Sequence, residues 1–130
     1  MVSKLRSERI AERIFEELST LLIMEVADPR LDNVSITHVS VDRELAYAKI
    51  YVSSIGGSAV SASIMEGLQH AKGFLRRQLA RLIPLRSFPQ LRFIWDPIPE
   101  RADHIDKLLD RLTKEEKNSP TDEEDSNLNG

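Results

Sequence analysis

The sequence predicts one α+β domain with the element order α-β-β-α-α-β, a three-stranded sheet and a short C-terminal helix. Apolar residues recur at helical spacing in residues 5–27, 58–83 and 105–112. Stretches typical of strands lie between the helices, at residues 34–41, 46–53 and 91–95. A chain of 130 residues is long enough for one hydrophobic core and too short for two typical domains. With 41% apolar and 30% charged residues, the composition is that of an ordinary soluble protein.

The first predicted helix covers residues 5–27. Its apolar stripe consists of Ile10, Ile14, Leu18, Leu21 and Leu22. The helix should end at Asp28-Pro29, because the residue before a proline is disfavoured in the helical conformation. At about 100° per residue, Arg6, Arg9 and Arg13 fall on one flank of the stripe. They form a basic patch diluted by Glu16 and Glu17.

The two neighbouring strands predict an antiparallel hairpin, because only residues 42–45 separate them. In residues 34–41 the apolar positions change parity near His38, which indicates either a β-bulge or a switch of face there. In residues 46–53 alternation is regular and places Tyr47, Lys49 and Tyr51 on the face opposite the small and aliphatic residues. The two tyrosines are expected either to pack in the core or across strands, or to stack on bases.

Residues 58–83 predict two short helices that meet at Ala71-Lys72-Gly73. Gly73 lacks a Cβ atom, so it can leave the helical conformation easily and lets another backbone approach closely.

Basic residues surround the predicted kink. They are Lys72, Arg76, Arg77 and Arg81, followed by Arg86 and Arg92. On a helix, Lys72 and Arg76 lie on one side of the apolar stripe, whereas Arg77 and Arg81 lie nearly opposite it. The pattern favours Lys72 and Arg76 as phosphate contacts beside the kink, and an ordinary solvated helix face is the alternative.

The last strand places Leu91, Phe93 and Trp95 on one face, where we expect them to join the core. Asp96-Pro97-Ile98-Pro99 ends this strand.

Residues 113–130 contain six acidic and two basic residues and have the polar composition of a disordered tail. The predicted organisation is therefore a domain at 1–112 and an acidic tail at 113–130. Although the whole chain has a net charge of -3, the domain alone is about neutral, with 16 basic and 15 acidic residues.

Several classes of function are disfavoured. The chain has no cysteine, and His38, His70 and His104 lie far apart without acidic residues at metal-ligand spacing. No glycine-rich nucleotide-binding motif or nucleophile elbow is present. We therefore expect no cofactor, metal or small-molecule substrate, and an α+β enzyme remains only a weak alternative. The charged N-terminus and the lack of a long apolar run predict a cytoplasmic protein without a membrane segment, and we expect a monomer.

The predicted element order, with helices packed on one face of the sheet, resembles a type II KH domain. KH domains clamp single-stranded nucleic acid with a Gly-x-x-Gly loop between two helices, and this junction has no such loop. Ala71-Lys72-Gly73 instead resembles the Ala-x-Gly interhelical kink of the ribosome-binding factor A family. Further similar segments are Asp28-Pro29-Arg30-Leu31, residues 46–53, Gly73-Phe74-Leu75-Arg76, Leu85-Arg86, Pro89, and Leu91-Arg92-Phe93 followed by Asp96. The resemblance covers about residues 5–112 and departs at Pro97-Ile98-Pro99, where the family commonly has a more polar, serine-containing segment.

The resemblance implies a non-catalytic assembly factor for the small ribosomal subunit. Members of this family bind the immature 30S subunit, support late maturation and 5′-end processing of 16S rRNA, and are associated with cold adaptation. We expect rRNA contacts from basic residues near the kink and on the first helix. These candidates are Lys72, Arg76, Arg81, Arg86, Arg6, Arg9 and Arg13. The alternative is a KH-like protein-interaction module whose basic residues are only surface charge.

Overall fold

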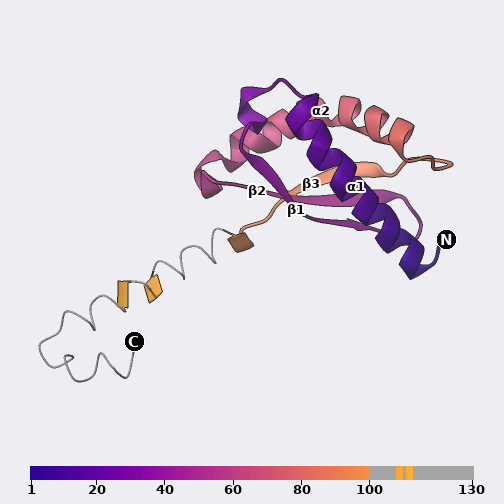
Figure 1. The fold of residues 1–130 in the computed structure, drawn as a ribbon, viewed down its shortest axis with the longest axis horizontal. Coiled ribbons are helices and arrows are strands. Elements are labelled where there is room, and N and C mark those ends of the chain that lie inside the picture. Colours follow the sequence, from indigo (N-terminus) through magenta and orange to yellow (C-terminus); the bar gives the residue numbers. More distant parts are fainter. Residues whose placement is uncertain (100–107, 110, 113–130) are drawn as a thin grey trace, which may run out of the picture. The chain divides into compact units, whose positions relative to one another are not determined.

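The computed structural model describes residues 1–99, 108, 109, 111 and 112. It contains α1 (Lys4–Met24), β1 (Val34–Val41), β2 (Tyr47–Ser54), α2 (Ser61–Leu82) and β3 (Gln90–Trp95), as Figure 1 shows. Short 3-10 turns, η1 (Pro29–Leu31) and η2 (Gly57–Val60), precede β1 and α2. Residues 1–97 form one compact unit, to which the description below refers. The predicted tail at 113–130, and half of the predicted helix at 105–112, lie outside the described residues.

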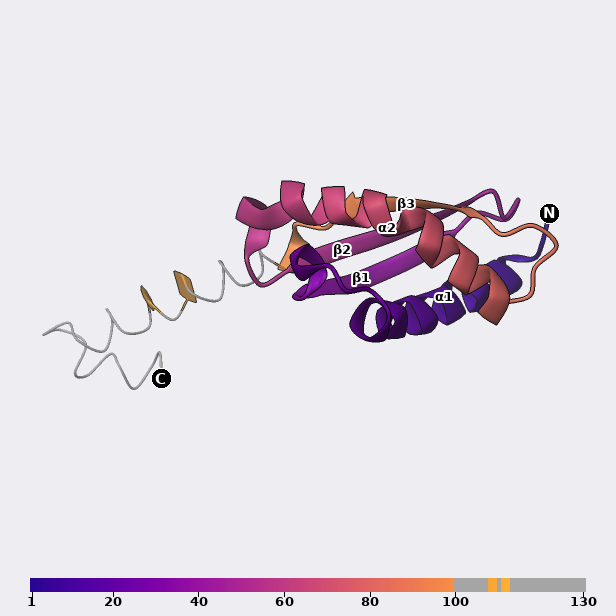
Figure 2. The same ribbon diagram turned by 90° about the horizontal axis from the view of Figure 1, so that it is seen from above.

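The sheet has the strand order β1-β2-β3, with β1 antiparallel and β3 parallel to β2. Figure 2 shows α1 and α2 on the same face of the sheet. α1 packs mainly on β1 and α2 mainly on β3, and the two helices also contact each other. The helices and the sheet face that they cover share one core, in which Ile14, Leu18, Ile50, Leu68 and Leu79 are fully buried. The predicted α+β, type II KH-like class is confirmed.

The predicted bulge is present in β1, where the register with β2 shifts between Ile36 and His38. The shift lets both Ile36 and Val39 reach the core, although regular alternation would place these two residues on opposite faces. Thr37 at the bulge donates its hydroxyl to Asp96 Oδ2 at 2.6 Å. Asp96, the residue that follows β3, also donates its N–H to the Val52 carbonyl. Asp96 is therefore anchored to β2 and holds the bulge of β1 in place.

Residues 61–82 form one helix, so the prediction of two short helices was wrong in this detail. Ala71, Lys72 and Gly73 lie inside α2 and do not interrupt it. Figure 2 nevertheless shows the axis of α2 changing direction part-way along its length. The helix also begins three residues later than predicted, because residues 57–60 form η2. Glycine at the middle of a helix allows a bend without breaking the hydrogen-bonding pattern.

Side-chain contacts tie the segment after α1 to α2. Asp28 accepts hydrogen bonds from the backbone and the guanidinium of Arg30, and the Arg30 guanidinium also contacts Glu66 at 3.2 Å and His70 at 3.2 Å. Gly67 faces this cluster. A Cβ atom there would lie 3.1 Å from Leu31 Cδ2 and 3.3 Å from Arg30 Nε.

Replacing Gly67 by alanine should therefore destabilise the fold by about 1 kcal/mol, because Leu31 is buried and the Arg30 guanidinium is held by Asp28. Gly73→Ala is the matched control in the same helix. It should stabilise the fold by about 0.5–1 kcal/mol through helix propensity. Urea unfolding of both variants measures the difference, and equal effects would show that the packing at Gly67 is not tight.

The contact with Arg30 lowers the pKa of the Asp28 carboxyl, mainly through their side-chain hydrogen bonds. Because the pKa is lower in the folded state, the ionised carboxyl stabilises the protein at pH values above the ordinary aspartate pKa. This stabilisation is lost as the pH falls through the folded-state pKa. In urea unfolding, Asp28→Asn should therefore be less stable than the natural sequence near neutral pH, and the gap should close at acidic pH. A gap independent of pH would contradict this linkage.

Candidate nucleic-acid interface

Charge is unevenly distributed along the described chain. Residues 67–95 contain six basic residues and no acidic one, whereas residues 1–66 contain seven basic and ten acidic residues. The second half of α2, the following loop and β3 therefore form the cationic part of the unit. Anionic ligands will be attracted to this part even though the whole chain is slightly acidic.

Arg76, one of the two residues favoured by the sequence, serves the fold. Its Nε donates to the Pro89 carbonyl at 3.1 Å, and its Nη2 donates to the Phe88 carbonyl. These bonds hold the loop between α2 and β3 against the helix. Lys72, the other favoured residue, is half-buried on the same flank of α2.

Arg77 is the residue that the sequence-based selection left out. It is exposed, and Arg81 is exposed one turn later. Gly73 is exposed too, and the only described atom near a Cβ built on it would be Arg77 Nη1, at 3.3 Å. The position of Arg77 opposite the apolar stripe, which follows from helical geometry, already indicated that its side chain would be exposed. We call Gly73, Arg77 and Arg81 the outer face of α2.

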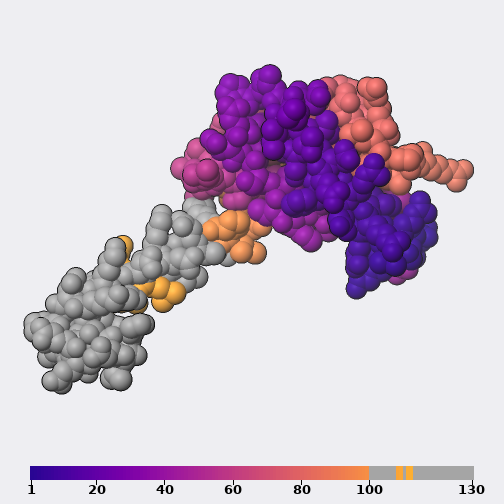
Figure 3. Space-filling model, viewed as in Figure 1, coloured from indigo at the N-terminus to yellow at the C-terminus, as the bar shows by residue number. Residues whose placement is uncertain are grey.

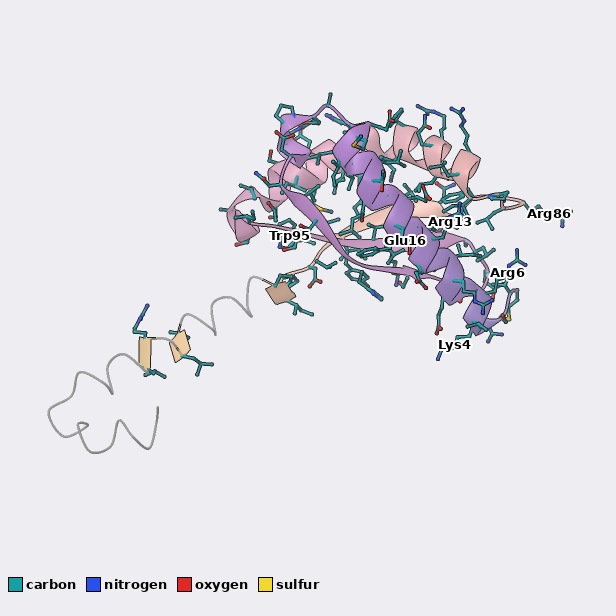
Figure 4. The ribbon with its side chains drawn as sticks, viewed as in Figure 1. Lys4, Arg6, Arg13, Glu16, Arg86 and Trp95 are labelled. Carbon is teal, nitrogen blue, oxygen red and sulfur yellow. The ribbon has the colours of Figure 1, made fainter. Side chains whose placement is uncertain are left out.

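A further group of predicted residues lies at one end of the unit. Figure 4 shows Arg6 near the start of α1 and Arg86 at the tip of the loop that joins α2 to β3. This loop projects from the body in Figure 3, and the last turn of α2, which contains Arg81, leads into it. Arg6, Arg9 and Arg86 are exposed. Together with Arg13 and Arg81, five predicted cations are thus exposed.

Arg13 joins the two helices. Its Nη2 donates to the carbonyl of Leu82 at 3.1 Å, and its Nε lies 3.6 Å from Glu17 Oε1. A cation at the C-terminal end of a helix also interacts favourably with the helix dipole. The structure therefore brings Arg13 and Arg76 into internal contacts and leaves the outer face of α2 accessible.

The aromatic residues of the open sheet face pack across strands. The Arg92 guanidinium lies 3.7 Å from the centre of the Tyr47 ring, and the rings of Tyr51 and His38 are 5.7 Å apart. Trp95 packs against the core, as predicted.

Among the described residues, no group of three or more histidine and acidic side chains is placed to hold a metal ion. No helix in this part of the chain combines the length and apolar character that crossing a membrane requires.

Comparison with known proteins decides the family. The sequence profile described as Ribosome-binding factor A matches residues 6–109. The chain belongs to the ribosome-binding factor A family. It is 39% identical over 118 residues to Ribosome-binding factor A of Thiobacillus denitrificans, covering 91% of this chain and 95% of the relative.

Solved structures of ribosome-binding factor A share the fold. The crystal structure of the Thermus thermophilus protein superimposes with a TM-score of 0.54 at 22% identity, over 71% of this chain and 94% of that one. A homology model of the Thermus thermophilus protein, fitted into a cryo-EM map of a 30S–RbfA complex, gives a TM-score of 0.50 at 23% identity, over 68% and 88% of the two chains. This neighbour was thus placed in a complex with the 30S subunit.

Arg76→Ala should destabilise the protein by about 1–3 kcal/mol, because it removes charged hydrogen bonds and leaves the Phe88 and Pro89 carbonyls without this donor. Arg77→Ala, one residue later and exposed, should change stability by less than about 0.5 kcal/mol. Denaturant midpoints of the two variants make the comparison. Equal midpoints would argue against the internal role of Arg76.

Proposed function

We propose that this protein is an assembly factor that binds the immature 30S subunit and supports late maturation and 5′-end processing of 16S rRNA. Membership of the ribosome-binding factor A family supports the ribosomal role, and a relative fitted into a 30S complex supports the subunit. In this proposal the protein acts in the cytoplasm as a monomer, without a cofactor or catalytic activity. A role in growth at low temperature follows from the same family resemblance.

The exposed glycine on α2 carries the proposal for the binding surface. Glycine inside a helix costs roughly 0.5–1 kcal/mol relative to alanine. Gly73 has a helical, unstrained backbone and no close neighbour except the flexible end of Arg77. Apart from the bend of α2, the described residues therefore give no reason for glycine at this position. Close approach of a partner's backbone to α2 does give a reason.

The surroundings of Gly73 suit a phosphate backbone. Neither Arg77 nor Arg81 forms a hydrogen bond or an ion pair with any described residue, so both guanidinium groups can bind an anion. Lys72 borders the same turn, and Arg86, Arg6 and Arg9 extend the surface toward the end of the unit. We propose that Arg76 and Arg13 position the loop and the helices that present these groups. Contacts to phosphates alone would fix the position of the protein without reading base sequence.

Binding must discriminate between states of the subunit for the protein to assist maturation. A ligand shifts a conformational equilibrium only by the difference between its affinities for the two states. We infer that the outer face of α2 fits an rRNA arrangement present in the immature subunit and that this fit is lost in the mature one. Release then needs no chemical step in this protein.

Arg77→Glu combined with Arg81→Glu should abolish most of the co-sedimentation with immature 30S subunits, because it replaces two attractive phosphate contacts by repulsive ones. The binding constant should also depend less on salt: the slope of its logarithm against the logarithm of salt concentration should decrease in magnitude by about one for each lost phosphate contact. Lys49→Glu, on the opposite face of the sheet, changes the net charge by -2 and is the matched control for the single variants Arg77→Glu and Arg81→Glu, which are measured beside the double variant.

Gly73→Ala separates contact from stability in the same assay. It should weaken subunit binding while leaving the protein at least as stable as the natural sequence. If the double arginine variant binds as well as the natural protein, the basic residues are only surface charge. A KH-like protein-interaction module would then be the better interpretation.

A further inference from the structure

A groove that includes two glutamates, Glu8 and Glu12, runs between α1 and β1. It has a volume of about 480 Å³ and is lined by Ser7, Glu8, Ala11, Glu12 and Phe15 from α1 and by residues 37–41 of β1. β1 is an outer strand of the sheet, because β2 is its only partner among the described residues. Hydrogen bonds between Val2 and Arg43 attach the segment before α1 to the turn after β1. The groove therefore combines a helix wall with the edge of a sheet.

The edge of β1 offers backbone groups to a partner strand. The Asp42 N–H donates to the Tyr47 carbonyl. Bonded and non-bonded pairs alternate along an antiparallel ladder, so the next non-bonded pairs are Val41 with Ala48 and Val39 with Ile50. Val39 and Val41 consequently direct their N–H and C=O groups away from β2. Within the described residues no group pairs with them, and an added extended segment can do so.

The bulge limits the length of this edge. The extra residue at Thr37 interrupts the ladder and is held by Asp96 and by the Tyr51 carbonyl. Regular pairing with an added strand is thus restricted to residues 38–41. This is the same stretch of β1 that, together with Thr37, lines the groove.

The charge of the groove identifies its occupant. Glu8 and Glu12 are exposed, lie one helical turn apart and form no ion pair with any described residue. Their carboxylates attract lysine and arginine side chains that project from an extended segment. The chain's own tail at 113–130 has a net charge of -4 and would be repelled. Nucleic acid would be repelled for the same reason.

We propose that the groove between α1 and β1 binds a short, extended, basic peptide segment of a protein partner by strand addition to residues 38–41. Main-chain hydrogen bonds to Val39 and Val41 supply affinity, and Glu8 and Glu12 select lysine or arginine at alternate positions. The site is separate from the basic outer face of α2 and uses the opposite charge.

A titration of the full-length protein with an eight-residue peptide of alternating arginine and threonine tests the proposal. Backbone amide signals followed by nuclear magnetic resonance should shift at Val39 and Val41, and an alternating glutamate and threonine peptide should cause no shift. Methylating the peptide nitrogens that face β1 should abolish binding, whereas methylating the alternate nitrogens should not. Shifts confined to the acidic tail, or absent from β1, would overturn the proposal.

Variants of the protein test the role of charge. Glu8→Lys combined with Glu12→Lys should weaken peptide binding about tenfold, as expected for two exposed charge pairs. Glu25→Lys combined with Asp32→Lys changes the net charge equally outside the groove and should alter binding less than about twofold. Equal effects of the two variants would show attraction by overall charge only and overturn the proposal. Pairing of β1 between two copies, detected as a dimer by sedimentation without peptide, would also overturn it.

Glu8→Lys/Glu12→Lys should retain salt-sensitive association with the 30S subunit, because the outer face of α2 is unchanged. Failure of the peptide site and failure of the proposed ribosomal function are therefore observed separately.

Discussion

The parallel pairing of β2 with β3 is the constraint on which the remaining structure depends. Parallel neighbours require a crossover, and α2 supplies it with 22 residues, roughly 33 Å of helix. The chain must then return to place Gln90 beside the Ala46 carbonyl, with which it forms a 2.9 Å hydrogen bond. Arg76 fixes this return by binding two carbonyls of the loop. The crossover is covered by the sheet on one side only, so its other side remains available as the outer face.

One-sided burial explains why the strands could be predicted from the sequence. A strand with a core on one face must alternate, and all three predicted strands agree with the structure to within one residue at each end. The change of parity at His38 located the bulge for the same reason. The stripe of α1 likewise reflects burial of a single helix face.

Features that depend on distant residues could not be predicted in this way. Gly73 permits a break between helices but does not force one, which is why the predicted interruption of α2 was wrong. The contacts of Arg76 depend on the position of residues 88 and 89 after the loop has folded back. The cluster of Arg30 with Glu66 and His70 similarly joins segments that are far apart in the sequence.

The candidate site illustrates a related distinction between the flank and the outer side of a helix. Helical geometry separated Lys72 and Arg76 from Arg77 and Arg81 correctly, but it could not show that Arg76 would bind two carbonyl groups within the protein. Cations beside an apolar stripe lie close to neighbouring loops, and carbonyl groups there can accept their hydrogen bonds. Cations opposite the stripe have only solvent or another molecule to contact.

Segregation of charge gives the two surfaces different ligands without a large net charge. The strongly basic segment 67–95 attracts nucleic acid to its own part of the unit and to neighbouring surfaces. Acidic residues on α1 reduce that attraction at the opposite edge of the sheet, where the bulge at Thr37 leaves a short stretch of β1 open. The same glutamates that discourage RNA there favour a basic peptide. Under the two proposals, rRNA binds at α2 and a basic protein segment binds at β1 at the same time, because neither ligand competes electrostatically for the other surface.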